Sequence, residues 1–191
     1  LRLAEMEAAA GRPREGLALA EKAQALAASS SIYIRYALGA KIDEIVGRIL
    51  RNTGDYSGSI KRLEAGIKRL TGWGGARKGT QAFYLVELGD SLLARGDTAR
   101  AVETWMRAKA LMISVNGPTH PSLAQVWERV LDLAWRQGRW SDAEDAIHSL
   151  LSIVATHQEA VSRAGTERDR RANAKTVSES GARLLSLLVE T

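Results

Sequence analysis

The chain has 191 residues, is 45% hydrophobic and carries a formal net charge of +5 at pH 7. This hydrophobic fraction is enough to build a core, so wholesale disorder is not expected. The sequence contains no cysteine, which excludes disulfides, cysteine-ligated zinc and thiol catalysis. No run approaches the roughly 18 consecutive apolar residues of a membrane-spanning helix.

Helix dominates the expected secondary structure. Ala, Leu, Arg and Glu are abundant and only three prolines occur, which favours helix, while no segment alternates clearly enough to be a strand. The chain opens on LRLAEMEAAAG, in mid-pattern and without an initiator Met, so we expect a fragment of a longer protein. Apolar residues recur at helical spacing in segments placed, in chain order, at 1–10, 13–28, 31–52, 56–71, 79–95, 97–115, 120–137, 140–157, 160–178 and 182–190.

Turn glycines recur at a nearly constant distance. Each is followed by a polar residue and then by Pro, Thr or an aromatic, and the spacings are 43, 42 and 42 for Gly11, Gly54, Gly96 and Gly138. A glycine can adopt the left-handed conformation that ends one helix and turns the chain into the next. The pattern predicts four helical hairpins, each with a leading helix before its glycine and a trailing helix after it.

Small and bulky residues keep fixed places around each glycine. Five residues after it stand Gly16, Ser59, Ala101 and Ala143, and nine after it stand Ala20, Leu63, Trp105 and Ile147. Seven before it stand Ala4, Gly47, Gly89 and Leu131. Small residues let antiparallel helices approach closely, and stacked hairpins bury the apolar face that one hairpin exposes. We therefore expect Trp105, Trp127 and Trp140 to be packing residues.

Helix–turn–helix units with these positions resemble tetratricopeptide repeats. Trp127 and Ala143, on either side of the GRW turn, stand where that family prefers an aromatic residue and an alanine. The usual period is about 34 residues, whereas the period here and the opening GPTHPSLA resemble the longer repeat of kinesin light chains and of many bacterial proteins. The resemblance implies an all-α fold, an α-α superhelix in which antiparallel helix hairpins stack into a right-handed solenoid.

The resemblance covers most of the chain. Residues 1–158 are predicted to form four such repeats, of which the first is incomplete and the fourth, 117–158, matches best. The second is degenerate, with Asp43 where an aromatic is preferred. Residues 159–191 are predicted to be C-terminal capping helices or a decayed fifth repeat.

No metal, cofactor or catalytic site is predicted. His120, in THP, is interpreted as a helix start, because His148 and His157 lie on another helix and cannot complete a zinc site. GWGGARKGT, residues 72–80, lacks the residue order and the preceding strand of a phosphate-binding loop. Trp73 in that loop either packs over the core or stands exposed as a binding anchor. No Ser/His/Asp grouping has a supporting turn, so we expect a protein that is not an enzyme.

The resemblance also implies a binding site for a protein or peptide. In the family, one face of the leading helices tends to line a concave groove. We expect an extended segment there, held by Phe83, Val86, Leu93 and Trp135, with Arg48 and Arg51 orienting acidic residues in it. The Lys/Asn set by which some family members clamp a C-terminal carboxylate is not reproduced. The predicted partner-binding residues are Lys41, Arg48, Arg51, Phe83, Val86, Asp90, Leu93, Gln125, Glu128, Asp132 and Trp135, and the resemblance also places Glu44 in the groove.

Two alternatives stay open. The chain could be the regulatory or sensory arm of a larger signalling protein, fused to a protease or a nucleotide-dependent switch. It could also bind nucleic acid or an anionic surface through residues 41–78, which carry nine basic and four acidic residues. We favour a solvated outer helix for SIKRLEAGIKRL, residues 59–70, over this electrostatic role. A cytoplasmic location is favoured, the composition points to a bacterial genome, and the oligomeric state is not indicated.

Overall fold

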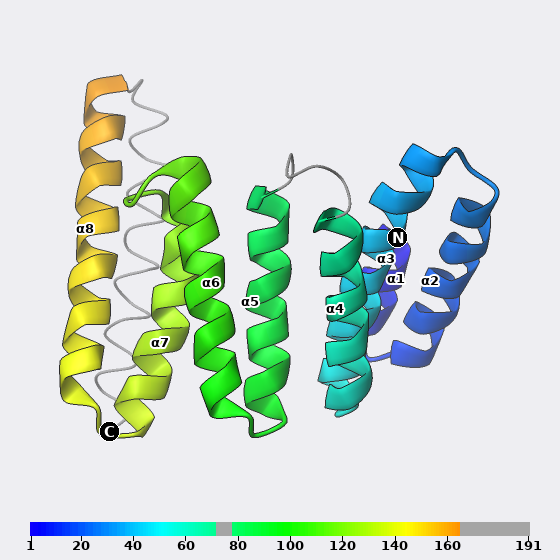
Figure 1. The fold of residues 1–191 in the computed structure, drawn as a ribbon, viewed down its shortest axis with the longest axis horizontal. Helices are drawn as coiled ribbons and strands as arrows, with labels where there is room; N and C mark the ends of the chain where they lie inside the picture. Colours follow the sequence, from blue (N-terminus) through cyan, green and yellow to red (C-terminus); the bar gives the residue numbers. More distant parts are fainter. Residues whose placement is uncertain (72–77, 165–191) are drawn as a thin grey trace. The chain divides into compact units, whose positions relative to one another are not determined.

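The computed structural model describes residues 1–71 and 78–164, apart from the side chains of residues 32–34 and 160–164. Throughout these ranges the chain is helical and contains no strand (Figure 1), which confirms the all-α fold class. The helices are α1 (Arg2–Ala9), α2 (Pro13–Ala28), α3 (Ile32–Asn52), α4 (Tyr56–Thr71), α5 (Lys78–Ala94), α6 (Thr98–Asn116), the 3-10 helix η1 (Pro121–Leu123), α7 (Ala124–Arg136) and α8 (Trp140–Ala164).

Two compact units divide the chain, Leu1–Leu111 and Met112–Thr191. The first contains the hairpins α1/α2 and α3/α4, then α5 and most of α6. In this unit each trailing helix packs against the next leading helix, α2 on α3 and α4 on α5. The second unit contains the end of α6, η1 and the hairpin α7/α8, whose two helices pack on each other.

The four predicted turn glycines all adopt the left-handed conformation. Their φ angles are +80° at Gly11, +86° at Gly54, +92° at Gly96 and +65° at Gly138. In every turn the backbone N–H of the next residue donates at 2.9 Å to the carbonyl four residues before the glycine, as in Asp97 to Leu92 and Arg139 to Ala134. This bond satisfies a carbonyl that the end of a helix would leave unpaired. The period in the sequence is therefore the period of one repeated helix ending.

Close approach between the two helices of a hairpin depends on size complementarity. A Cβ atom on Gly47 would lie 2.8 Å from Leu63 Cγ, and one on Gly89 would overlap the indole of Trp105. Both glycines stand seven residues before a turn, and both bulky partners stand nine residues after it. Trp105 is 1% exposed, and its Nε1 donates to the Val86 carbonyl at 3.3 Å and to Asp90 Oδ1 at 3.1 Å. The large ring thus fills the space that glycine leaves.

The other predicted packing tryptophans are less enclosed. Trp127 is half-buried, and Trp140 is 61% exposed, so the prediction that Trp140 is a packing residue is wrong. Trp140 is the first residue of α8, directly after the turn. At this position its ring contacts Trp135 of the preceding helix edge-to-face, with the ring centroids 5.1 Å apart.

An ion-pair triad replaces an aromatic residue in the second hairpin. Asp43 is 2% exposed, and its two carboxylate oxygens accept from Arg62 Nη1 at 3.1 Å and from Arg69 Nε at 2.8 Å. Both arginines come from α4. A buried carboxylate is tolerated because both of its oxygens are paired with cations. At Asp43, ion pairs therefore connect α3 to α4 where the family prefers the packing of an aromatic side chain.

Two predicted helix boundaries are wrong. The predicted helix 120–137 begins as the 3-10 turn η1, in which His120 Nδ1 accepts from the backbone N–H of Ser122 at 3.2 Å, and α-helix starts only at Ala124. The predicted break after residue 157 is absent, since α8 continues to Ala164. Residues 155–164 contain no proline or glycine to end it. Trp73 and residues 165–191, including the predicted caps, lie outside the described residues.

None of the helices in the described ranges has the length and apolar character needed to cross a lipid bilayer.

Two helical glycines with opposite surroundings test the packing argument. Gly89→Ala should lower the free energy of unfolding by about 1–3 kcal/mol, because the indole of Trp105 must move to admit a methyl group. Gly39→Ala should raise it by up to about 1 kcal/mol through helix propensity, since its Cβ would lie at an ordinary 3.5 Å from Arg69 Cδ. Urea unfolding followed by circular dichroism measures both. Equal effects of the two substitutions would contradict the close-approach interpretation.

Candidate functional site

Ion pairs join the leading helices of the first unit. The α3 helix packs against both α1 and α5. Arg48 of α3 donates to Glu5 Oε1 of α1 at 2.5 Å, and its other guanidinium nitrogen lies 3.5 Å from Glu44. Lys41, two turns of helix before Arg48, pairs with Glu44 and lies 3.9 Å from Glu5. The predicted site residues Lys41 and Arg48 therefore lie together, but each already holds an internal carboxylate.

Arg51 continues this network from α3 to α5. Its Nη1 atom lies 2.8 Å from Glu87 Oε2 and 3.4 Å from Asp90 Oδ2. Because Asp90 also accepts from the buried Trp105 Nε1 through its other oxygen, the core tryptophan fixes the carboxylate that Arg51 binds. Arg51 and Asp90 were both predicted as site residues, and the structure joins them to each other.

Apolar side chains of α5 differ sharply in their access to solvent. Phe83, in the second turn of the helix, is 47% exposed, whereas Val86 is 1% exposed and lies in the core. Leu93, near the end of the helix, is half-buried. A partner could reach Phe83 and part of Leu93 but not Val86, so Val86 is left out of the surface considered below.

We use the name leading-helix surface for a set of neighbouring side chains on α1, α3 and α5 of the first unit. It carries three cations and four carboxylates among its members, so it is close to neutral and slightly acidic. Each of its cations is paired with at least one of its acids. Its members are Glu5, Lys41, Glu44, Arg48, Arg51, Phe83, Glu87, Asp90 and Leu93.

The remaining predicted residues lie on α7 in the second unit. Gln125 Nε2 donates to the Ser122 carbonyl at 3.1 Å, and Asp132 Oδ1 accepts from Arg136 Nε at 3.0 Å. Trp135 packs on Trp140, and its indole N–H is buried without a hydrogen-bond acceptor among the described residues. Glu128 is half-buried on the same helix. These four residues form a set of their own on α7.

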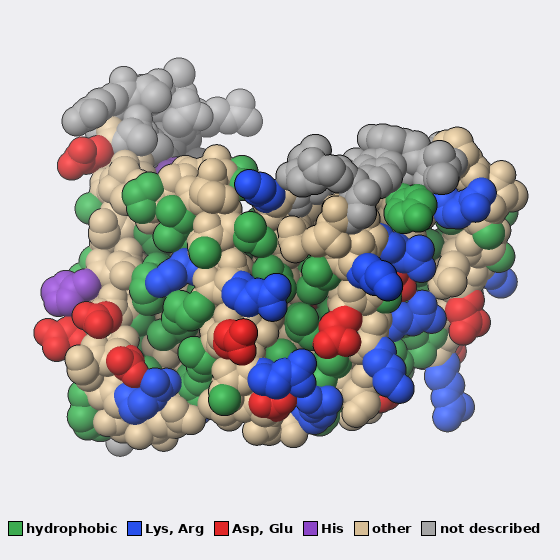
Figure 2. Space-filling model, in the orientation of Figure 1, with side chains coloured by type: hydrophobic (Ala, Val, Ile, Leu, Met, Phe, Trp, Pro, Cys, Tyr) green, Lys and Arg blue, Asp and Glu red, His purple; other side chains and the backbone are tan. Residues whose placement is uncertain are grey.

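Internal pairing removes much of the charge expected of residues 41–78. Arg62 and Arg69 hold Asp43, while Arg48 and Arg51 hold acids of the leading-helix surface. Among the cations in the described part of this segment, only Lys61, Lys68 and Lys78 lack an ion pair. On the face drawn in Figure 2, Lys and Arg side chains alternate with Asp and Glu over α4 to α6. Internal ion pairs therefore occupy the arginines in the described part of this segment.

Sequence reasoning missed Glu5 and Glu87. Glu5 stands six residues before its turn glycine, as do Arg48, Asp90 and Asp132, so the repeat register contained the signal that Glu5 faces Arg48. Glu87 lies one turn before Asp90, and only the tilt of α3 against α5 brings Arg51 to both. The register could have found the first residue but not the second.

No group of three or more His, Asp or Glu side chains suited to a metal ion occurs among the residues the structure describes. At the exposed first turn, a hydrogen bond to Glu7 raises the pKa of Arg12. This shift has no consequence near neutral pH, because arginine is protonated there in any case.

Comparison with known proteins identifies the repeat. The sequence profile of the tetratricopeptide repeat family matches residues 80–153. A kinesin light chain-type protein of Podosopora anserina with nearly identical TPR-like repeats superposes with a TM-score of 0.63 at 17% identity, covering 96% of this chain and 93% of that chain. BtubC (BKLC) from P. vanneervenii superposes with a TM-score of 0.70 at 14% identity, covering 95% and 78%. No curated protein sequence matches.

Residues 80–153 thus match the tetratricopeptide repeat family, and the chain has the α-α superhelix fold of kinesin light chain-like tetratricopeptide-repeat proteins. The resemblance and the fold class predicted from the sequence are both confirmed. The bacterial origin stays a prediction. Repeats of this family generally mediate protein interactions, which their extended surfaces allow.

The Arg51 network makes a testable contribution to stability. Arg51→Met should lower the free energy of unfolding by about 1–3 kcal/mol, because it removes the guanidinium shared by the half-buried carboxylates of Glu87 and Asp90. Arg136→Met removes an exposed pair with Asp132 and should change it by less than about 0.5 kcal/mol. Urea titrations of both variants provide the comparison. An effect of Arg51→Met as small as that of Arg136→Met would show that the network does not hold α3 to α5.

Proposed function

We propose that this chain is a non-catalytic scaffold that binds a protein or peptide segment on the leading-helix surface, with Phe83 as the main anchor. The observation that carries the proposal is an aromatic ring left 47% exposed on a surface whose charges are already paired with one another. Burying most of such a ring contributes about 2 kcal/mol to binding. Aromatic side chains are enriched among the residues that dominate binding energy at interfaces.

Rigid support makes Phe83 suited to this role. The α5 helix is fixed on one side by the Trp105 contact with Gly89 and on another by Arg51. A ring presented by a helix that is already held in place loses little conformational freedom when a partner covers it. Leu93, on the same helix, extends the apolar contact.

Charge plays a secondary part in the proposed contact. An acidic segment would have to share or displace Glu5 at Arg48, or Glu87 at Arg51. Arg48 is the more accessible of the two, with 35% of its side chain exposed against 21% for Arg51. We therefore place any acidic residue of the partner beside Arg48, and we expect the affinity to depend only weakly on ionic strength.

The second unit offers a separate contact surface in this proposal. It comprises the predicted residues of α7 and the exposed ring of Trp140, which rests on Trp135. The partner could be a separate protein, or it could be another segment of a longer polypeptide in which this chain is a regulatory arm. Either partner would contact the same surfaces. A cytoplasmic site of action remains part of the proposal. The α7 members are Gln125, Glu128, Asp132 and Trp135.

Loss of the Phe83 ring is the direct test. Phe83→Ala should weaken partner binding by roughly thirtyfold, the equivalent of about 2 kcal/mol, while the circular dichroism spectrum and the unfolding midpoint stay unchanged. The measurement is quantitative affinity purification of binding proteins from the source organism, followed by titration of the retained protein. Leu26→Ala is the matched control, because Leu26 is a large apolar residue, 73% exposed, on the trailing helix α2.

The same set of proteins retained equally by wild type, Phe83→Ala and Leu26→Ala would refute the leading-helix surface as the binding site. A steep fall in affinity with added salt would instead favour an electrostatic contact through the free lysines of residues 41–78.

A further inference from the structure

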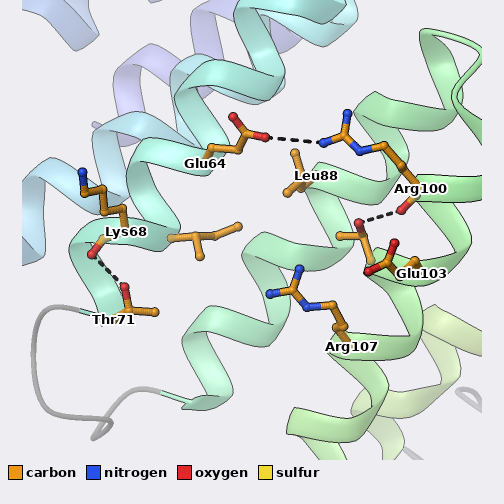
Figure 3. A pocket seen from close by; sticks show the side chains of 9 residues that line it. Glu64, Lys68, Thr71, Leu88, Arg100, Glu103 and Arg107 are labelled. Atoms are coloured by element: carbon orange, nitrogen blue, oxygen red, sulfur yellow. Dashed lines mark hydrogen bonds and ion pairs between the residues drawn. The ribbon is translucent and has the colours of Figure 1, made fainter.

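A groove of about 450 Å³ opens between the trailing helices α4 and α6, with α5 at its base. Figure 3 shows the side chains that line it. Each trailing helix contributes four residues at the spacing i, i+3, i+4, i+7, which places them on one face of that helix. The α4 row is Glu64, Ile67, Lys68 and Thr71, and the α6 row is Arg100, Glu103, Thr104 and Arg107.

This groove does not belong to the leading-helix surface. Leu88 forms its base from α5, whereas Asp90 of the same helix joins the leading-helix network. Two residues along an α-helix correspond to a rotation of about 200°, so Leu88 and Asp90 point in nearly opposite directions. A ligand in the groove and a partner at Phe83 would therefore occupy different faces of the first unit.

One end of the groove is closed by charge. Arg100 Nη2 lies 3.8 Å from Glu64 Oε1 across the gap between α4 and α6 (Figure 3). The two threonine hydroxyls are occupied as donors within their own helices, Thr71 to the Lys68 carbonyl at 2.9 Å and Thr104 to the Arg100 carbonyl at 2.7 Å. Their oxygens can still accept, but neither hydroxyl is a free donor.

Arg107 is the arginine of the groove lining that holds no acidic side chain in the described part of the chain, whereas Arg100 pairs with Glu64. It has no ion pair among the described residues, and its guanidinium extends toward the middle of the groove (Figure 3). The ammonium of Lys68 points away from the middle, toward the outer edge of α4. Ile67 and Leu88 supply apolar surface beside Arg107. The groove thus combines one free guanidinium with an apolar base.

The charges of the lining define the ligand that fits. Three cations and two carboxylates give the groove a net charge of +1, which a single carboxylate neutralises. A phosphate dianion or a nucleic-acid backbone carries more negative charge than this lining neutralises, and Glu64 and Glu103 would repel it more strongly than a single carboxylate. A row that spans i to i+7 is roughly 10 Å long, which matches about three residues of extended peptide.

We propose that the groove between α4 and α6 binds a short extended peptide segment in which one Asp or Glu, flanked by aliphatic residues, places its carboxylate on Arg107. The guanidinium donates two parallel N–H groups to the two carboxylate oxygens. The aliphatic neighbours cover Ile67 and Leu88. This site is additional to the one proposed on the leading-helix surface and does not depend on it.

The probe for this proposal is the tripeptide Leu-Glu-Leu, acetylated and amidated so that the glutamate is its single charge. Titrated into the isotope-labelled full chain, it should shift the amide resonances of residues 64–71 and 100–107. Replacing its glutamate by glutamine should weaken binding about fivefold, and Arg107→Gln should do the same. Glutamine in both should weaken it no further than either change alone, because the two changes remove the same interaction.

Matched variants separate this site from its alternatives. Arg14→Gln, an exposed arginine of α2, and Phe83→Ala should both leave tripeptide binding unchanged. Loss of binding in Phe83→Ala with none in Arg107→Gln would place the peptide on the leading-helix surface and overturn the proposal. Inorganic phosphate that shifts the same amides as strongly as the tripeptide, at equal concentration, would reduce the groove to a simple anion site and would also overturn it.

Discussion

Close packing of a small residue on one helix against a bulky residue on its partner is the constraint on which the rest of the first unit depends. At Gly89 and Trp105 this pairing reaches its extreme, because the indole occupies the space where a Cβ atom would stand. At Gly47 and Leu63 the same repeat positions meet with a smaller side chain. The short distance between the two helices determines which side chains on the outer faces of each hairpin can contact one another.

The polar network of the leading helices is built on this packing. Trp105 Nε1 donates to Asp90, Asp90 faces Arg51, and Arg51 also holds Glu87. Glu5 and Arg48 repeat the contact one hairpin earlier. Residues six positions before each turn thus alternate in sign from one hairpin to the next through the first unit. Since neighbouring hairpins neutralise each other, the leading helices need no partner to satisfy their charges.

Two features that the packing of the first unit leaves exposed are suited to binding. Phe83 is a large ring in solvent on an otherwise paired surface, and Arg107 is a lone guanidinium beside apolar side chains in a groove. Neither is needed to hold the hairpins together. Both lie on helices fixed by their neighbours, which is the condition under which a contact gives specificity at low entropic cost. By contrast, the arginines in the described part of residues 41–78 are paired with acidic side chains of the protein itself.

The sequence by itself determined the hairpins, because a left-handed glycine and the residues around it act through local geometry that repeats at a fixed period. It also placed Lys41, Arg48, Arg51, Asp90 and Phe83 on the leading helices, since that follows from the same register. Only the tertiary structure decided that Val86 is buried, that Trp140 is exposed and that Asp43 holds Arg62 and Arg69. Those outcomes depend on how one helix is rotated and tilted against another. Side chains from different elements set that geometry jointly, so no single segment encodes it.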